Sequence, residues 1–266
     1  MTRWFFSSLF FLSLAQKKYL SYTSERFRRN HVQVKQGDTL EPREHLATLF
    51  QAVRARSRPL VIEFTGTPTS GKTTLINGLD SIFRHNGFRV RRPQEGAEVF
   101  RNTSRKTPLY NILTGAYGVT NVVQAVGTKD ADIVLLDRAL FDAFAWALFW
   151  TARGKLSPAE CDAFQSFVTM RELASCVDLG LFVLCDAEEA MRRAAKDAPS
   201  AYNDRKEGGY TNPETITLLL GIFGEACRTL HEEGHPVVAI DTTTLPKEAM
   251  FDAALRELCS RFAPVS

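Results

Sequence analysis

One short stretch, residues 66–74, limits the folds open to this chain more than any other feature. It follows the apolar, β-rich run LVIEFTG (60–66) and fits the pattern G-x-x-x-x-G-K-[ST] at every position. Glycines let the backbone curl so that successive N–H groups point inward, and a helix beginning near Gly71 adds its positive N-terminal end. Such a loop holds phosphate groups. Its residues are Gly66, Thr67, Pro68, Thr69, Ser70, Gly71, Lys72, Thr73 and Thr74.

Two side chains of this loop indicate which phosphate compound it holds. Lys72 is placed to reach the β- and γ-phosphates of a nucleoside triphosphate, and the Thr73 hydroxyl is placed to bind Mg²⁺. We therefore expect ATP and Mg²⁺ as cofactors. The loop by itself predicts nucleotide binding and leaves the reaction open.

The rest of the chain alternates strand-like and helical patterns, which indicates a parallel sheet with helical crossovers. Residues 197–212 are a long polar connection typical of a lid. We predict an α/β fold of the P-loop NTPase type, with three α/β/α layers and a five-stranded parallel sheet. The four strands after 60–66 are expected at 88–92, 132–137, 179–185 and 236–241. Helices are expected at 71–86, 107–127, 139–153, 157–175, 187–197, 212–232 and 246–262.

The strand-like run IVLLD (133–137) ends in a carboxylate, the form expected of the second acidic strand of such proteins. Asp137 is thus a second candidate ligand for Mg²⁺. The next residue is Arg138, where motor-type ATPases usually place a glutamate that polarises water. A guanidinium at this point favours a site that binds a second phosphate or a phosphate acceptor.

At this point the sequence resembles the thymidylate kinase-like and deoxynucleoside kinase group of P-loop kinases, over about residues 59–262. The likeness is carried, in order, by VIEFTGTPTSGKTT, RRPQEGAE, IVLLDRALFDAFAWA and DAEEAMRRAAKD. It implies that Asp137 helps to hold Mg²⁺ and that Arg138 contacts the acceptor or the transferring phosphate. It also implies that Glu95 is the general base or acceptor anchor, and that Arg192, Arg193 and Lys196 are lid cations.

The acceptor motifs depart from those of thymidylate kinases. The interior of the loop at 66–74 contains no acid or arginine, and in RRPQEG (91–96) the acid follows the proline. Asp-Arg-Ala (137–139) stands where thymidylate kinases favour Asp-Arg-Tyr and deoxynucleoside kinases Glu-Arg-Ser. Further candidates for the acceptor pocket are Arg101, Arg105, Tyr110 and Asn111.

Three functions remain open from the sequence. The leading hypothesis is ATP-dependent, Mg²⁺-assisted phosphoryl transfer to a small acceptor, a nucleoside or a nucleoside monophosphate. The second is a P-loop ATPase or nucleotide-binding regulatory protein with weak or no transferase activity. The third is a polynucleotide-end kinase, which the net charge of −4 on residues 59–266 disfavours, since nucleic-acid binding relies on many cationic contacts with phosphates. We expect a small-molecule acceptor, no nucleic-acid partner, and a homodimer.

Residues 1–58 are predicted to be a basic N-terminal extension with a net charge of +7, joined at Pro59 to the kinase-like domain 59–266. The extension contains an apolar segment, 4–15, and a predicted helix, 44–56. The apolar segment is shorter than the roughly 20 residues of a membrane-spanning helix. It remains open whether it is a signal-peptide core, an organellar presequence, a membrane-contacting segment over 4–29, a docked helix, or a stretch before the true start. We expect a cytoplasmic protein, with organellar targeting left open, and five reduced cysteines.

Overall fold

The computed structural model describes residues 42–196, 210 and 212–262 of the chain. The predicted apolar segment 4–15, the proposed membrane contact at 4–29 and nearly all of the predicted lid at 197–212 lie outside the described residues. Within them, no helix combines the length and apolar character needed to cross a bilayer.

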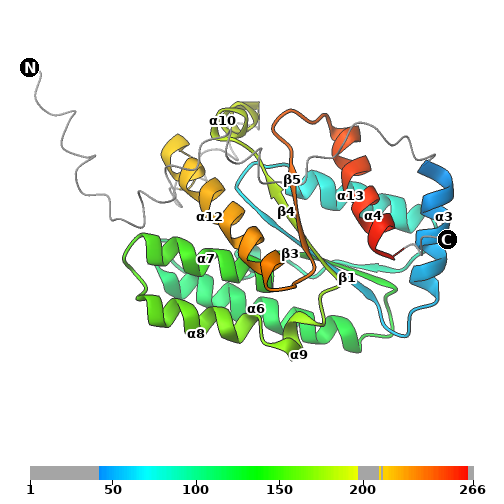
Figure 1. Ribbon diagram of the computed structural model, residues 1–266, viewed down its shortest axis with the longest axis horizontal. Helices are drawn as coiled ribbons and strands as arrows, with labels where there is room; N and C mark the ends of the chain where they lie inside the picture. Colours follow the sequence, from blue (N-terminus) through cyan, green and yellow to red (C-terminus); the bar gives the residue numbers. More distant parts are fainter. Residues whose placement is uncertain (1–41, 197–209, 211, 263–266) are drawn as a thin grey trace, which may run out of the picture.

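Five parallel strands form the centre of the molecule in the order β2-β3-β1-β4-β5 (Figure 1). The predicted sheet is thereby confirmed. Strand β1 lies in the middle of the sheet. All seven of its residues are buried, as is required of a strand that is covered on both faces. The strands are β1 Leu60–Gly66, β2 Val90–Arg91, β3 Ile133–Asp137, β4 Leu179–Leu184 and β5 Val237–Asp241.

Helices cover both faces of this sheet and complete the predicted three layers (Figure 1). One face carries α6 (Pro108–Gly127), α7 (Leu140–Ala152) and α12 (Pro213–Glu232), with α8 (Pro158–Val168) packed against α7. The other face carries α3 (Pro42–Arg54), α4 (Lys72–His85) and α13 (Lys247–Phe262). The remaining helices are α5 (Gly96–Val99), α9 (Arg171–Ala174) and α10 (Ala187–Lys196).

The predicted elements differ from the structure in three places. The helix expected at 157–175 is two helices, because the extended backbone of Met170 (φ −53°, ψ 141°) interrupts it. The strand expected at 88–92 is limited to 90–91, since this edge strand pairs only with β3. The short helix α5 had no predicted counterpart.

Helix α3 belongs to the same hydrophobic core as α4 and α13. One side of this helix is apolar and faces the core, since Leu49, Phe50 and Val53 are buried. The Phe50 ring lies 5.2 Å from that of Phe88 and 6.4 Å from that of Phe83, measured between centroids. These contacts fix the predicted helix of the N-terminal extension onto the sheet layer that carries the phosphate-binding loop.

Candidate active site

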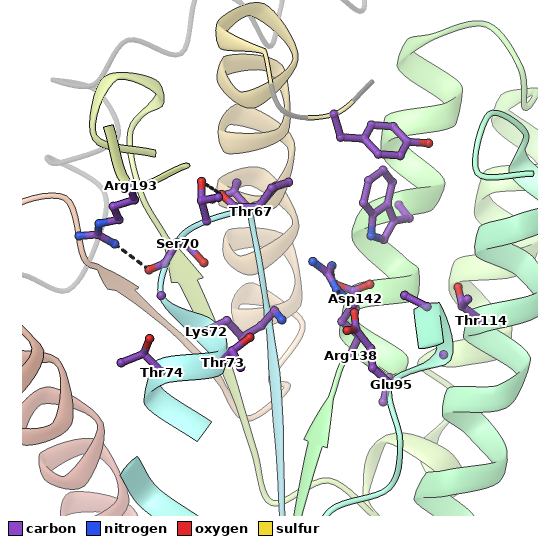
Figure 2. A pocket seen from close by; sticks show the side chains of 18 of the residues that line it. Thr67, Ser70, Lys72, Thr73, Thr74, Glu95, Thr114, Arg138, Asp142 and Arg193 are labelled. Carbon is purple, nitrogen blue, oxygen red and sulfur yellow. Dashed lines mark hydrogen bonds and ion pairs between the residues drawn. The ribbon is translucent and has the colours of Figure 1, made fainter. Parts of the chain in front are cut away.

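A cleft of about 870 Å³ lies at the carboxyl end of the parallel strands, where ligands bind in open α/β sheets. Figure 2 shows its two walls. The loop 66–74 and Arg193 form one wall, and the other carries Glu95, Arg138 and Asp142. Of the residues predicted for catalysis and for nucleotide or metal binding, all line the cleft except Gly66 and Asp137. Asp137 contacts Lys72, which does line it.

The backbone of the loop adopts the curled conformation that its sequence predicts. Gly66 has φ +144°, Thr69 +58° and Gly71 +94°, all in the region that favours glycine. A Cβ atom at Gly66 would stand 1.9 Å from the carbonyl oxygen of Val183 on β4. Gly66 is therefore required both by its φ and by the close approach of the neighbouring strand.

Two hydroxyl groups of the loop fit a bound polyphosphate. The Thr67 and Ser70 side-chain oxygens are buried and have no hydrogen-bond partner among the described residues. A buried hydroxyl without a partner carries a desolvation cost, and phosphate oxygens in the loop would supply acceptors. Neither residue is specified by the G-x-x-x-x-G-K-[ST] pattern, so the sequence alone could not assign these roles.

Lys72 and Asp137 form an ion pair at the base of the cleft, with 2.5 Å between Nζ and Oδ1. The pair joins α4 to β3, because Lys72 is the first residue of α4 and Asp137 is the last residue of β3. In the sheet, Asp137 lies opposite Phe64 of β1. The Thr73 hydroxyl and the Asp137 carboxylate are hard oxygen ligands of the kind Mg²⁺ prefers. A magnesium ion held by them would neutralise charge on the β- and γ-phosphates. Among the described residues, no group of three or more His, Cys, Asp or Glu side chains suggests another metal site.

The two predicted lid arginines of α10 have different surroundings. The Arg193 guanidinium donates to the carbonyl oxygens of Ser70 (3.1 Å) and Thr242 (2.5 Å), and thus holds α10 against the loop. Arg192 is 53% exposed and pairs with Glu189. Both arginines bond to Glu189 and lower the pKa of its carboxyl to about 2, so this group stays ionised at neutral pH.

Arg138 is the centre of a charged network on the opposite wall. Its Nε donates to Glu95 Oε1 (3.1 Å), its Nη1 to Asp142 Oδ1 (2.6 Å) and its Nη2 to the Gly66 carbonyl oxygen (3.3 Å). Burial alone lowers the pKa of Arg138, but the adjacent carboxylates of Asp142 and Glu95 raise it above its ordinary value. The guanidinium is therefore a permanent cation joined to the predicted acceptor carboxylate and to the phosphate-binding loop.

Three residues that take part in this network were not predicted from the sequence, namely Asp142, Thr65 and Glu63. Asp142 accepts from Thr65 Oγ1 at 2.5 Å as well as from Arg138. Glu63 is fully buried and accepts hydrogen bonds from the backbone at the start of α7. A single acid within the apolar run LVIEFTG was the available signal for Glu63, because an unpaired buried carboxylate is costly.

Aromatic and polar side chains complete the acceptor end of the cleft. Of the predicted pocket residues, Arg105, Tyr110 and Asn111 line it, whereas Arg101 does not. The Asn111 Oδ1 accepts from Trp150 Nε1 (2.8 Å), which fixes the amide. Trp146 and Tyr210 also line the cleft, with ring centroids 5.2 Å apart, and the Tyr210 hydroxyl donates to the Arg105 carbonyl oxygen.

Solved structures identify the architecture. Deoxyadenosine kinase from M. mycoides with the products dCMP and a flexible dCDP matches with a TM-score of 0.54 and 16% identity, over 76% of this chain and 100% of that chain. The same enzyme with dCTP matches with a TM-score of 0.54 and 15% identity, over 76% of this chain and 100% of that one. Its dATP complex gives 0.53 and 15%, over 75% and 98%.

The chain has the deoxynucleoside kinase fold. The predicted resemblance and the predicted P-loop NTPase architecture are thereby confirmed at the level of the fold. No family model and no curated protein sequence matches the chain. At 15–16% identity these matches show the fold alone. Roles for individual residues of this chain are therefore argued below from the geometry of its own cleft.

Proposed function

We propose that the protein is an ATP- and Mg²⁺-dependent kinase that phosphorylates a hydroxyl group of a nucleoside. The observation that carries this proposal is the position of Arg138, which bonds to Glu95 and to the Gly66 carbonyl oxygen in one cleft. A phosphate on the loop and an acceptor hydroxyl at Glu95 would both be within reach of this cation. Phosphoryl transfer depends chiefly on such positioning and charge neutralisation.

The distribution of charge in the cleft supports a neutral acceptor. Among the described residues, the loop wall has one lining carboxylate, Glu189, and several lining cations, which are Lys72, Arg192, Arg193, Lys196 and Lys247. The described residues of the acceptor wall include Arg138 and Arg105 and also Glu95 and Asp142, so their formal charges cancel. A triphosphate suits the cationic first wall, and an uncharged nucleoside suits the second wall, where the formal charges of the described lining residues cancel.

Glu95 is the candidate general base or acceptor anchor of this reaction. It precedes α5, and its carboxylate faces the cleft beside Arg138. One oxygen of this carboxylate accepts from Arg138 Nε, and the carboxylate can also accept a hydrogen bond from an acceptor hydroxyl. General bases contribute less to phosphoryl transfer than the cations do.

The alternatives from the sequence receive less support from this cleft. A P-loop ATPase needs a group that polarises water next to the γ-phosphate. This chain has Arg138 directly after Asp137, at the position where such ATPases place a glutamate that polarises water. A polynucleotide-end kinase needs a cationic groove, but the acceptor wall is neutral.

A transfer assay tests the proposed function. We expect labelled ATP with Mg²⁺ to pass its γ-phosphate to one or more nucleosides in a panel of nucleosides, nucleoside monophosphates and oligonucleotide ends. Monophosphates should react at least about tenfold more slowly, since the described acceptor wall has no net positive charge to balance a second phosphate. Release of inorganic phosphate at the same rate with and without every acceptor would contradict the proposal.

We also propose that the protein is a homodimer that pairs through α6. This helix contains no charged residue in its 20 positions, although Leu109 is 70% and Val123 is 52% exposed. A surface helix without charges is typical of a buried interface. We expect sedimentation to show a dimer for the native chain and a monomer for Val123→Glu. Val99→Glu, a similarly exposed position on α5, is the control that should remain dimeric, and dimers in both variants would contradict the proposal.

A further inference from the structure

Glu63 makes an unusual set of contacts for a residue in the centre of a sheet. It lies on β1 and is fully buried. Its Oε1 accepts from the backbone N–H groups of Ala139 (3.0 Å) and Asp142 (2.9 Å), and its Oε2 from those of Leu140 (3.0 Å) and Phe141 (3.1 Å). These four groups are the N-cap and the first turn of α7.

A helix leaves its first backbone N–H groups without partners inside the helix. A side chain of the N-cap residue or of the first turn normally accepts hydrogen bonds from these N–H groups. In α7 the N-cap residue is Ala139, which has no polar side chain. Asp142 stands at the third position, where an acid often bonds back to the N-cap. Because Glu63 caps α7 from the sheet, the Asp142 carboxylate is free to bind Arg138 and Thr65.

Arg138 stands immediately before this capped turn. Its φ of +69° is uncommon for a residue with a side chain, and its N–H donates to the Phe64 carbonyl oxygen at 2.9 Å. The peptide that follows is held by the bond from the Ala139 N–H to Glu63. The strained backbone of Arg138 is thus held on both sides by β1, which also leads into the phosphate-binding loop.

We propose that Glu63 is a positioning residue of the transfer site, which caps α7 from β1 and thereby aligns Arg138 and Asp142 with the phosphate-binding loop. The inference rests on the proposed function, because it gives Arg138 a part in transfer. One residue of β1 would then set the distance between the two walls of the cleft. Glu63 itself lies outside the cleft lining, so it would act through the groups that it holds.

The burial of this carboxylate is costly, which argues against a role in packing alone. Burial raises the pKa of Glu63 to about 7, although its hydrogen bonds to the backbone of Asp142 and Phe141 act in the opposite direction. An apolar residue would fill the same space without that cost, but it would leave the first turn of α7 without acceptors. The residue type is therefore accounted for by the helix cap.

The test compares Glu63→Gln with the wild-type chain. The glutamine amide keeps one acceptor oxygen but turns an N–H₂ group toward two backbone donors. We expect kcat for transfer to fall about 10²-fold, as for other displacements of catalytic groups, while the affinity for an ATP analogue stays within about twofold. Hydrogen exchange at the amides of residues 139–142 should accelerate about tenfold.

Two further variants keep the test decisive. Glu63→Asp retains the carboxylate one methylene further from the helix, so kcat should lie between those of the wild type and Glu63→Gln, even where the glutamine variant folds poorly. Asp178→Asn is the matched control. Asp178 also accepts a β1 backbone N–H, that of Val61 at 2.8 Å, but at the opposite end of the strand. The Asp178→Asn substitution should therefore leave kcat and the hydrogen exchange of residues 139–142 unchanged.

The outcomes separate this inference from the proposed function. Unchanged kcat in a folded Glu63→Gln protein, or a lower kcat with unchanged exchange at 139–142, would overturn it. An equal fall in kcat for Asp178→Asn would also overturn it, because the effect would then come from general destabilisation. Hydrogen exchange requires no turnover, so slow exchange that persists in Glu63→Gln refutes the cap even when no acceptor in the panel is phosphorylated.

Discussion

The Arg138→Ala variant is expected to lose about 10³-fold in kcat for acceptor-dependent transfer, the lower end of the range for a cation that stabilises transferring phosphate. The substitution removes the cation and also leaves Glu95 and Asp142 without their shared partner. Two adjacent uncompensated carboxylates repel the phosphate that must approach Glu95. Arg138→Lys should recover only part of the loss, because an ammonium group cannot bond in the fixed fork with which the guanidinium reaches both acids.

The loss should be confined to transfer. The loop 66–74 keeps its own backbone geometry, so an ATP analogue should bind the Arg138→Ala protein within a fewfold of its wild-type affinity, as measured by calorimetry. Arg101→Ala is the matched control, since Arg101 lies outside the cleft lining and its Nε donates to the nearby Glu98 carbonyl oxygen at 3.0 Å. A decrease in acceptor-free ATP hydrolysis as large as that in transfer would contradict the role of Arg138.

Local patterns in the sequence were enough to predict the parts of the fold that depend on short-range preferences. The apolar run at 60–66 and the glycines at 66 and 71 determine a buried strand and a curled loop without help from distant residues. Helix boundaries also followed from local patterns. The exceptions were the short helix α5, which was not predicted, and the break at Met170, where the helical pattern of the sequence continues but the helix does not.

The contacts that organise the cleft could not be predicted in this way, because they join residues far apart in the sequence. Glu63 and Asp142 are brought together only when β1 lies beside β3 and α7 crosses over the sheet. The same is true of Arg193, whose contact with the Ser70 carbonyl oxygen joins α10 to the loop. The sequence indicated the cations as candidates, but the residues that they contact could be identified only from the topology of the fold.

The Lys72→Ala variant is expected to lose both transfer and acceptor-free hydrolysis, by at least about 10³-fold. Lys72 is 8% exposed and its ammonium group lies at the base of the cleft, where the loop and the start of α4 would surround the phosphates. In a site with little water, a positioned cation stabilises developing charge more than the same cation does in solution. Binding of an ATP analogue should weaken as well, measured by calorimetry.

Arg84→Ala is the control for this variant, because Arg84 lies on the same helix and also pairs with an acid, Asp80 at 2.7 Å, but is far from the loop. It should keep full activity, so a loss there would indicate damage to α4 itself. The expected effects of Lys72→Ala and Arg138→Ala differ in which reactions are lost. Loss of all ATP-dependent reactions in the first and of transfer alone in the second would show that the two walls of the cleft have separate tasks. Retention of transfer in Lys72→Ala would refute the assignment of loop 66–74 to the ATP phosphates.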